Sequence, residues 1–351
     1  MLCGSGFHYI ADRFATAPEE ALVEHLAEQD GLYQGWVKSL QDRAPRVALA
    51  DGDDTRAIEA AAWLSEHTSV RPILITSSDS RPPSLSSRHV EVVHTSDIAD
   101  DKGVLQAICH KPDGTVRPDE EVDRLRGDAL YLSTSFVAAG HADACVAGAA
   151  RPTADVIRAG LKTIGLKDGV STVSSCFLIV LPDGRRLAYG DCAVLPEPDV
   201  DQLADVAIAT ADTFAGLTGE EPAVAMLSFS TLGSAAHPEV DRVRAATRAV
   251  QSRRPDLCVD GELQFDAAIL ESVGRSKADG SPVAGRANVF IFPNLAAGNI
   301  GYKITERLGG AAAIGPVLQG LSAPLNDLSR GCSSVDIAAV ALVSALQVDP
   351  A

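Results

Sequence analysis

The sequence predicts an α/β protein of two domains, each with a mostly parallel sheet flanked by helices. Three observations support this prediction. The chain has 351 residues, a length typical of two domains. Hydrophobic residues make up 46% of it and aromatic residues only 5%, so its cores are expected to consist mainly of Ala, Val, Leu and Ile. Short apolar runs alternate with helical stretches, and repeated βαβ units of this kind indicate parallel strands connected by helices.

The N-terminal half shows this alternation most clearly. A helical segment is expected at 19–43, and a loop rich in Ser and Pro at 77–87. Asp53 or Asp54 is expected to cap the helix that follows the first strand. Pro118 suits the first turn of a longer helix that reaches residue 139. The other expected elements are strands at 46–50, 70–76, 90–94 and 144–149 and helices at 53–67, 102–110 and 153–164.

The middle of the chain departs from this pattern. Two strands at 172–181 and 187–194 are joined by Pro182-Asp183-Gly184-Arg185, which is typical of a hairpin turn. Such a hairpin suits a second domain that begins after about residue 160. Further expected units are helices at 200–214 and 238–252 and strands at 223–229, 257–263 and 288–292.

The most informative segment is 313–336. A short buried strand is expected at 313–321, then a turn-rich stretch at 325–336 that runs into an apolar helix at 337–346. In α/β proteins the loop between a strand and a helix is a common place for a functional site. The N–H groups at the start of the helix favour an anion, and Arg330 adds a planar fork suited to phosphate. Asp336 is the carboxylate placed to move a proton, so the segment suggests acyl or phosphoryl transfer.

A structural interpretation of the same residues stays open. Ser333 and Asp336 match a capping box, in which a serine and an acidic residue three positions later pair with each other's backbone N–H groups. Capping and chemistry are not exclusive.

A family resemblance rests on long stretches of sequence. Residues 289–336 read VFIFPNLAAGNIGYKITERLGGAAAIGPVLQGLSAPLNDLSRGCSSVD. Four shorter stretches accompany this run: TADVIR at 153–158, TVSSCF at 172–177, MLSFSTLGS at 226–234 and GELQFDAA at 261–268. Together they resemble the phosphate acetyl/butyryl transferase family over residues 45–348, with the N-terminal third resembling it only loosely.

The resemblance implies a fold and an activity. The fold would be that of isocitrate and isopropylmalate dehydrogenases, with domains at 1–160 plus 316–351 and at 161–315 and the active-site cleft between them. The activity would be reversible transfer of an acetyl group between acetyl phosphate and coenzyme A. Asp336 would take the proton from the thiol, Arg330 would hold the phosphate and Ser329 would donate a further hydrogen bond to it. Coenzyme A would be a substrate, and neither a cofactor nor a metal is expected.

Further residues are expected to bind coenzyme A or acetyl phosphate. Arg158 matches an arginine that the family uses for these ligands, although a solvated helix arginine is the alternative. Asn326 either contacts the substrate or shapes its turn through local hydrogen bonds. The other candidates are hydroxyl side chains: Thr153, Ser174, Ser175, Ser230 and Thr231. Ser175 is equally compatible with an ordinary strand position.

Two segments depart from the family pattern. Where members commonly carry basic residues ahead of a Lys-Gly pair, this chain has Ala99-Asp100-Asp101-Lys102-Gly103. Arg151-Pro152 stands where Asn-Thr or His-Ser is usual, and Arg151 is a conjectural replacement for the missing charge. These departures bear on the affinity for coenzyme A and on the choice of acyl group.

Charge and cysteine content restrict the partners. With 30 basic and 47 acidic residues the net charge is −17, which argues against nucleic acid or an anionic membrane as a partner. Seven scattered cysteines without a Cys-x-x-Cys pair favour reduced thiols and a cytoplasmic protein. Cys332 is expected to pack under the key loop, a nucleophile being the alternative. No apolar run is long enough for a membrane span, and residues 1–15 do not have the pattern of a signal peptide. A homodimer is expected from the resemblance.

Three alternatives stay open. A sister enzyme could use propanoyl or butanoyl phosphate, because each methylene changes discrimination by only about 1–3 kcal/mol. A non-catalytic protein could bind acetyl phosphate or coenzyme A. A decarboxylating dehydrogenase would share the layout, but the sequence shows neither a dinucleotide fingerprint nor an evident cluster of metal-binding carboxylates.

Overall fold

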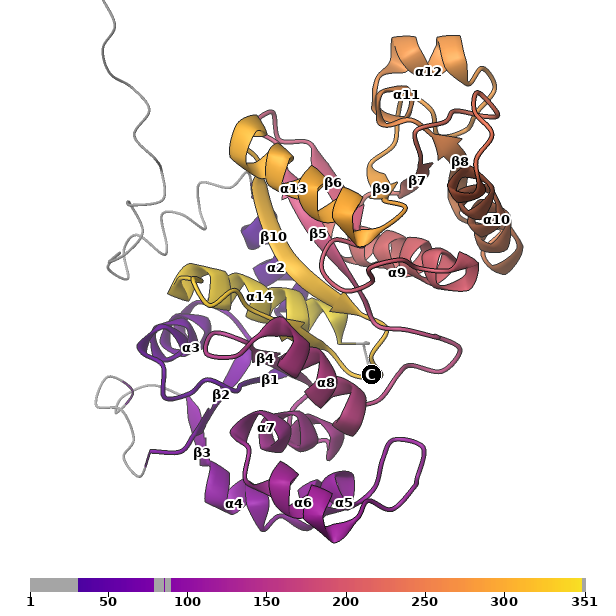
Figure 1. Ribbon diagram of the computed structural model, residues 1–351. Helices are drawn as coiled ribbons and strands as arrows, with labels where there is room; N and C mark the ends of the chain where they lie inside the picture. Colours follow the sequence, from indigo (N-terminus) through magenta and orange to yellow (C-terminus); the bar gives the residue numbers. More distant parts are fainter. Residues whose placement is uncertain (1–30, 79–84, 86–89, 349–351) are drawn as a thin grey trace, which may run out of the picture.

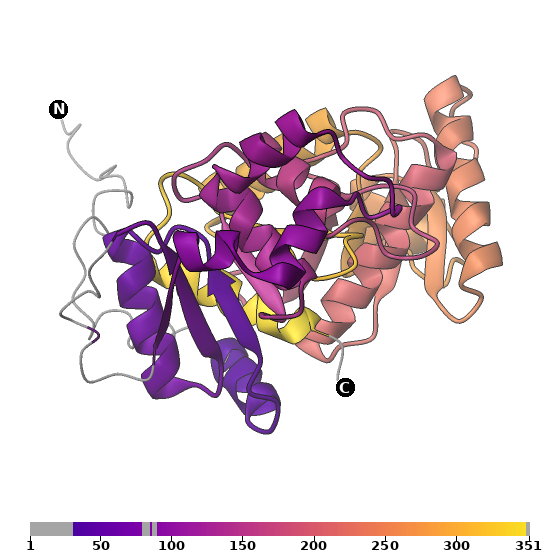
Figure 2. The same cartoon turned by 90° about the horizontal axis from the view of Figure 1, so that it is seen from below.

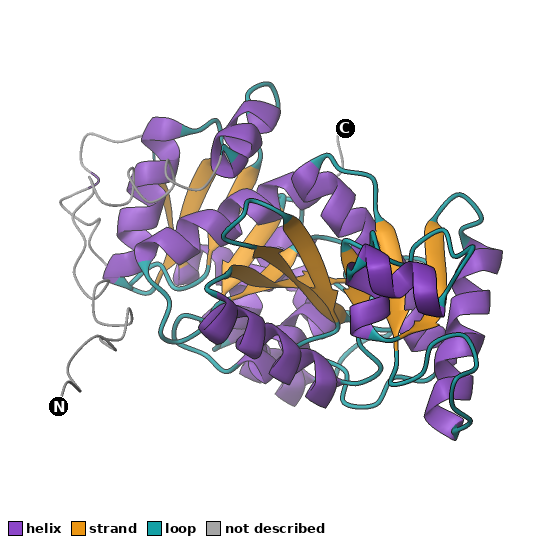
Figure 3. Ribbon diagram, turned by 90° about the horizontal axis from the view of Figure 1, so that it is seen from above, coloured by secondary structure: helices purple, strands orange, loops and turns teal. Residues whose placement is uncertain are grey.

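The computed structural model describes residues 31–78, 85 and 90–348, and it contains two sheets that lie side by side (Figures 1 and 3). The first sheet has five strands in the order β11-β4-β1-β2-β3, and all of its neighbouring strands are parallel. Its strands are β1 (Arg46–Leu49), β2 (Arg71–Thr76), β3 (Glu91–His94), β4 (Ala144–Ala147) and β11 (Leu325–Asp327).

The second sheet has six strands in the order β10-β5-β6-β9-β7-β8. The β10–β5 and β5–β6 pairs are antiparallel, which confirms the predicted hairpin, and the remaining pairs are parallel. Its strands are β5 (Ser174–Val180), β6 (Arg186–Gly190), β7 (Ala223–Leu227), β8 (Cys258–Leu263), β9 (Val289–Ile291) and β10 (Ala312–Gln319).

Helices cover both faces of the first sheet because alternate strand residues point to opposite faces. Val47 and Leu49 pack into one core with α3 and α14, whereas Ala48 packs into another with α7. Figure 2 shows this sheet from below, with its helices on either side. The helices are α2 (Leu32–Leu40), α3 (Thr55–His67) and α14 (Ser334–Gln347) on one side and α4 (Thr95–Ala99), α5 (Lys102–Cys109), α6 (Asp119–Arg126), α7 (Ala129–Ala138) and α8 (Thr153–Thr163) towards the other.

The second sheet is covered in the same way. Phe177 and Tyr189 belong to a separate core on the face of α13, whereas Cys176 and Leu178 join the large core that also contains residues of α9, α10 and α14. This large core is therefore continuous across the two sheets. The helices are α9 (Val200–Thr218), α10 (Pro238–Arg253), α11 (Phe265–Ile269), α12 (Glu271–Lys277) and α13 (Leu295–Gly309).

The predicted fold class and most predicted elements are confirmed, with three corrections. The single helix expected at 118–139 is wrong: it is broken after Gly127, and the Asp128 side chain caps α7 by accepting from Leu130 N–H. The stretch 325–327 is a buried strand rather than a turn, because it adds to the edge of the first sheet beside β4. Four helices were not expected, namely α4, α11, α12 and α13.

Other predictions lie partly outside the described residues. Of the helix expected at 19–43, residues 19–30 are not described, and α2 covers Leu32–Leu40. Most of the loop expected at 77–87 is likewise outside the described residues. The domain boundaries near residues 160 and 316 stay a prediction. The chain passes from the first sheet to the second between α8 and β5 and returns between β10 and β11.

A buried amide joins the two sheets at this return. Asn326 is fully buried on β11, and its Oδ1 accepts from Leu318 N–H of β10 at 2.7 Å. Its Nδ2 donates to Ser344 Oγ at 2.8 Å and to Gln347 Oε1 at 2.7 Å, both on α14. The three hydrogen bonds therefore connect β11 to both β10 and α14.

We expect Asn326→Ala to lower the free energy of unfolding by about 3 kcal/mol, because it leaves the buried Leu318 N–H without an acceptor and removes two further bonds. Urea denaturation followed by circular dichroism measures the change. Gln106→Ala, at an exposed position on α5, is the control. A loss of less than 1 kcal/mol in Asn326→Ala would contradict the role assigned to this amide.

Candidate active site

A cavity of about 530 Å³ lies between the two sheets, at the loop that connects β11 to α14. Residues from both sheets and from four helices contribute to its wall. On the side of the first sheet these include Tyr33, Thr153, Asp327, Ser329, Cys332 and Asp336. On the side of the second sheet they include Phe177, Asn299, Tyr302, Arg307, Ile314 and Pro316.

The path of the β11–α14 loop is fixed mainly through its backbone. The Arg56 guanidinium, on α3, donates to the carbonyl oxygens of Arg330 at 3.1 Å and of Cys332 at 2.7 Å. It also donates to the carbonyl of Ala149 at 3.3 Å and is paired with Asp54 at 2.6 Å. One side chain thus ties the loop to the segment after β4 and to the start of α3.

The start of α14 confirms the predicted capping box. Asp336 N–H donates to Ser333 Oγ at 3.2 Å, and Ser333 N–H donates to Asp336 Oδ2 at 2.8 Å. The Ser333 hydroxyl also donates to Oδ2 at 2.9 Å. These bonds hold the Asp336 carboxylate in one orientation, and within the described part of the chain its Oδ1 has no hydrogen-bond partner. Asp336 is exposed and lines the cavity, so Oδ1 is free to accept a proton.

Ser329 and Arg330 precede this cap. Both are exposed, and Ser329 lines the cavity. Ser329 Oγ accepts from Gly331 N–H at 3.3 Å, so its own proton is free to be donated. Among the described residues the Arg330 guanidinium has neither an ion-pair nor a hydrogen-bond partner. A hydroxyl, an unpaired guanidinium and an oriented carboxylate therefore occur within eight residues of one loop.

Asp327 lies beneath this group of residues and was not singled out from the sequence. It ends β11 with only 1% of its surface exposed, and its Oδ2 accepts from Thr153 Oγ1 at 2.5 Å. Burial raises the pKa of this carboxyl to about 6, although the Thr153 hydrogen bond opposes the rise. Thr153 begins α8, so the bond connects the start of α8 to the end of β11.

The opposite wall comes from the second sheet and α13. The rings of Phe177 and Tyr302 are stacked with their centroids 4.1 Å apart, which gives the cavity an apolar side. Asn299 is held by a hydrogen bond from its Nδ2 to the Cys192 carbonyl at 3.0 Å. Arg307 is exposed and forms an ion pair with Glu306 at 3.4 Å, and both residues line this wall.

Comparison with known proteins identifies the family of this chain. The family model for phosphate acetyl/butaryl transferase matches residues 33–345. The chain belongs to this family. It is 40% identical to a phosphate acetyltransferase from Clostridium acetobutylicum over 326 residues, which cover 89% of this chain and 96% of that one. A phosphate acetyltransferase from Staphylococcus epidermidis is also 40% identical, over 88% of this chain and 96% of its own.

Solved structures show the same relationship. A phosphotransacetylase from Streptococcus pyogenes superposes with a TM-score of 0.85 at 38% identity, covering 91% of this chain and 98% of that one. A phosphotransacetylase from Staphylococcus aureus gives a TM-score of 0.82 at 37% identity, covering 91% and 99%. The family is therefore supported by sequence and by fold.

In this family member the remaining predicted binding residues lie apart from the cavity. Arg158 is about half exposed on α8 and forms an ion pair with Asp155 at 2.6 Å. Asn326 is buried in the junction described above. Ser175 is fully buried and bonded to Asp191. The structure thus brings Thr153, Ser329 and Asp336 together at the cavity, and Arg330 is adjacent to Ser329 in sequence. Arg158, Asn326 and Ser175 lie elsewhere.

Ser230 and Thr231 follow β7 in the second sheet and do not line the cavity. Ser230 Oγ donates to Glu262 Oε1 at 2.7 Å, and Thr231 Oγ1 donates to Gln264 Oε1 at 3.3 Å. Glu262 also accepts a hydrogen bond from Arg244 Nε at 2.7 Å. These bonds lower the pKa of the Glu262 carboxyl to about 2 despite its burial. Both hydroxyls therefore contribute to a polar network at the ends of β7 and β8.

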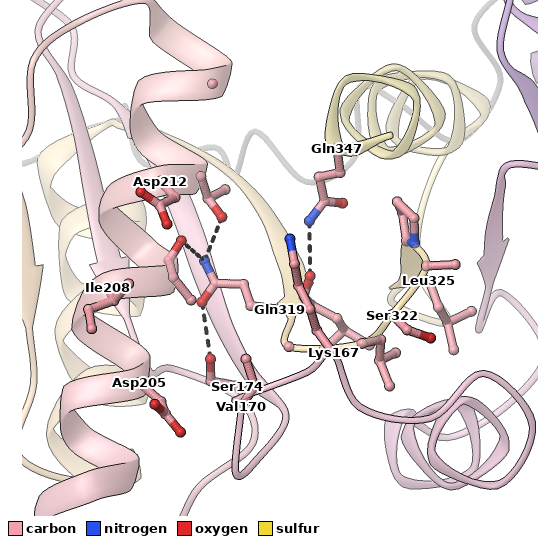
Figure 4. Close-up of a pocket in the computed structure, with 18 of the residues that line it drawn as sticks. Lys167, Val170, Ser174, Asp205, Ile208, Asp212, Gln319, Ser322, Leu325 and Gln347 are labelled. Atoms are coloured by element: carbon pink, nitrogen blue, oxygen red, sulfur yellow. Dashed lines mark hydrogen bonds between the residues drawn. The ribbon is translucent and has the colours of Figure 1, made fainter. Parts of the chain in front are cut away.

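Ser174 lines a second cavity, of about 640 Å³, at the other end of β10 (Figure 4). There its Oγ donates to Gln319 Oε1 at 3.1 Å, and Gln319 Nε2 donates to Thr213 Oγ1 at 2.8 Å on α9. Lys167 and Gln347 lie across this cavity. Residues 313–316 of β10 line the first cavity and residues 318–319 line the second, so one strand separates them.

In the segments that depart from the family pattern, the charged side chains of Asp100, Asp101 and Arg151 bond to residues within the helices and loops around the first sheet. Asp100 forms an ion pair with Arg126 at 3.0 Å. Asp101 caps α5 and accepts from His141 Nε2 at 2.9 Å. Arg151 forms an ion pair at 2.8 Å with Asp128, the N-cap residue of α7.

Two general findings apply to the described residues. No helix among them is long and apolar enough to cross a membrane. Nor do three or more His, Cys, Asp or Glu side chains among them form a group arranged to hold a metal ion.

Cys332 is buried under the loop, and burial raises the pKa of its thiol to about 11.

Ser333→Ala should lower the free energy of unfolding by about 1 kcal/mol, since it removes the N-cap acceptor of α14. It should also free the Asp336 carboxylate to rotate. Thermal unfolding measures the first effect. Ser334→Ala, one residue further along, is the matched control because no described residue bonds to its hydroxyl; equal stability of the two variants would contradict the capping role.

Proposed function

We propose that the protein is a phosphate acetyltransferase, which reversibly transfers an acetyl group between acetyl phosphate and coenzyme A. The observation that supports this most strongly is the loop at 327–336. It presents a carboxylate and a hydroxyl to one cavity between the sheets and carries the unpaired guanidinium of Arg330 next to them in sequence, in a chain whose relatives carry this name. The proposal includes coenzyme A as a substrate rather than a cofactor, a reaction without a metal, and a cytoplasmic homodimer that binds no nucleic acid.

In the proposed mechanism both substrates bind before any bond changes. Asp336 Oδ1 takes the proton from the coenzyme A thiol, because the thiolate rather than the thiol is the nucleophile. The thiolate attacks the acetyl carbonyl carbon and forms a tetrahedral intermediate. The bond from this carbon to the bridging phosphate oxygen then breaks, which yields acetyl-coenzyme A and inorganic phosphate. No acyl-enzyme is formed.

Charge builds up on the phosphate side of this intermediate. Arg330 offers two N–H groups in a plane that matches phosphate oxygens, and Ser329 offers one hydroxyl proton. Both groups are free of other acidic partners among the described residues, so they need not be released before substrate binds. Arg307 on the opposite wall is exposed and has N–H groups beyond its ion pair with Glu306, with which it would contact the phosphates of coenzyme A.

Choice of acyl group depends on the apolar side of the cavity. Phe177, Tyr302 and Ile314 line it, so a propanoyl or butanoyl group is the second candidate substrate. Thioester formation, followed by ultraviolet absorbance, from acetyl, propanoyl and butanoyl phosphate with coenzyme A tests the proposal. Fastest turnover of the acetyl compound is expected. Binding of coenzyme A without turnover of any of the three would instead indicate a non-catalytic binding protein.

Asp336→Asn should lower kcat by about 10²–10⁴-fold, because it keeps the shape of the cap and removes the base. Binding of coenzyme A, measured by calorimetry, should change little. Asp201→Asn, an exposed carboxyl in the first turn of α9, is the control. A kcat within a factor of about three of wild type would exclude Asp336 as the base.

Arg330→Gln should lower kcat/KM for acetyl phosphate by about 10²–10³-fold through loss of the charged donors. Its fold should be unaffected, since the side chain is exposed and its backbone carbonyl still accepts from Arg56. Steady-state kinetics beside Arg275→Gln, an exposed arginine on α12, measure the effect. Equal activity of the two variants would argue against phosphate binding by Arg330.

A further inference from the structure

The hydrogen bonding of Asp327 is incomplete in a way that burial makes costly. Its Oδ2 accepts a hydrogen bond from the Thr153 hydroxyl. Its Oδ1 is buried and has no hydrogen-bond partner in the described part of the chain. The neighbouring Leu328 N–H is donated to the Ala147 carbonyl at 2.9 Å. A buried and unpaired carboxylate oxygen is unfavourable when charged and far less so in a neutral acid.

The packing around this oxygen leaves no room for a side chain. Gly148 faces Oδ1 so closely that a Cβ at this position would lie 2.3 Å from it. The N–H groups of Gly148 and Ala149 are turned the other way, and both donate to Asp51 Oδ2 at 3.0 Å. The N–H groups of Gly148 and Ala149 are therefore committed to another carboxyl. The Leu328 N–H and the Thr153 hydroxyl favour the charged form of Asp327, but burial outweighs both, so the carboxyl is more readily protonated than an ordinary aspartate.

Asp327 also belongs to the wall of the cavity in which we place phosphate. It lies two residues before Ser329 and three before Arg330, and Thr153, its partner, lines the same wall. A negative charge on Asp327 would oppose an anion at this wall, whereas the neutral acid would not.

The charged groups on the surrounding elements are largely paired among themselves. Asp51, after β1, is the other carboxyl close enough to affect Asp327, and it disfavours the ionised form. The paired groups are Asp54 with Arg56 at the start of α3, Asp155 with Arg158 on α8, and Glu306 with Arg307 on α13. The other groups are Tyr33, Cys332 and Asp336, which line the cavity, and Arg330 on the same loop.

We propose that Asp327 is a positioning residue that couples anion binding in the cavity to the uptake of one proton from solvent. The phosphate binds to the form in which Asp327 is a neutral acid, still holding Thr153 and the start of α8. This inference rests on the proposed function, because it takes the anion to be the phosphate group of the substrate.

The direction of the pH effect follows from the raised pKa. Below about pH 6 Asp327 is already neutral, and anion binding requires no proton. Above this pH the carboxylate must take up a proton when the anion binds, so affinity falls as pH rises.

Sulfate is a suitable probe, because it remains a dianion through this range and its own protonation does not contribute. We expect the inhibition constant of sulfate against acetyl phosphate to rise with pH in wild type, by up to about tenfold per unit above about pH 6. In Asp327→Asn, which has the same shape but cannot titrate, the rise should be nearly absent. Asp201→Asn should behave like wild type. A wild-type slope retained in Asp327→Asn would overturn the inference.

A second variant separates titration from misfolding. Thr153→Val keeps Asp327 but removes a hydrogen bond that favours its ionised form, so the rise in the inhibition constant should begin at a higher pH. Thermal unfolding checks that both variants are folded. An unchanged onset in a folded Thr153→Val would count against the inference.

Calorimetry distinguishes this inference from the proposed function. Titration of sulfate into the full chain at about pH 7.5, in two buffers with different heats of ionisation, should show uptake of close to one proton in wild type and none in Asp327→Asn. This measurement does not need catalysis. A wild-type protein without transferase activity that still takes up the proton would refute the function alone, whereas sulfate binding without proton uptake would refute the coupling alone.

Discussion

The buried Asn326 amide joins three segments on which the candidate active site depends. Through it β10 of the second sheet, β11 of the first sheet and the C-terminal half of α14 are fixed to one another. The β11–α14 loop begins immediately after this junction, at Asp327, and ends where α14 starts. Because hydrogen bonds of a buried amide are directional, they fix the orientation of the segments as well as their contact. Residues from both sheets can therefore approach a single cavity.

Local sequence signals predicted much of this arrangement. The alternation of apolar and amphipathic stretches was sufficient for the βαβ units, because it reflects the periods of strands and helices. The hairpin followed from a Pro-Asp-Gly turn, and the capping box followed from the spacing of Ser333 and Asp336. Asp336, Ser329 and Arg330 are neighbours in sequence, so the loop that carries them could be singled out without knowledge of the fold, and their proposed roles stay a prediction.

Features that depend on distant contacts could not be predicted in this way. Asp327 was in the recognised segment, but its burial and its bond to Thr153 involve residues 174 positions apart. Asn326 was expected in a turn because its partners in β10 and α14 are not evident from local propensity. Ser230 and Thr231 were expected near the cleft as strand-end hydroxyls, yet Glu262 and Gln264 of the neighbouring strand engage them. A hydroxyl at a strand end has no local signature that separates these outcomes.

The way in which Arg56 holds the β11–α14 loop has a consequence for substitutions within it. Its guanidinium binds the carbonyl oxygens of Arg330, Cys332 and Ala149, and a carbonyl is present whatever side chain a residue carries. The course of the loop thus depends little on the exposed side chains at positions 330 and 331, whereas Cys332 is buried in the core. Substitutions at 330 and 331 can therefore alter the groups presented to a ligand while the backbone keeps its shape.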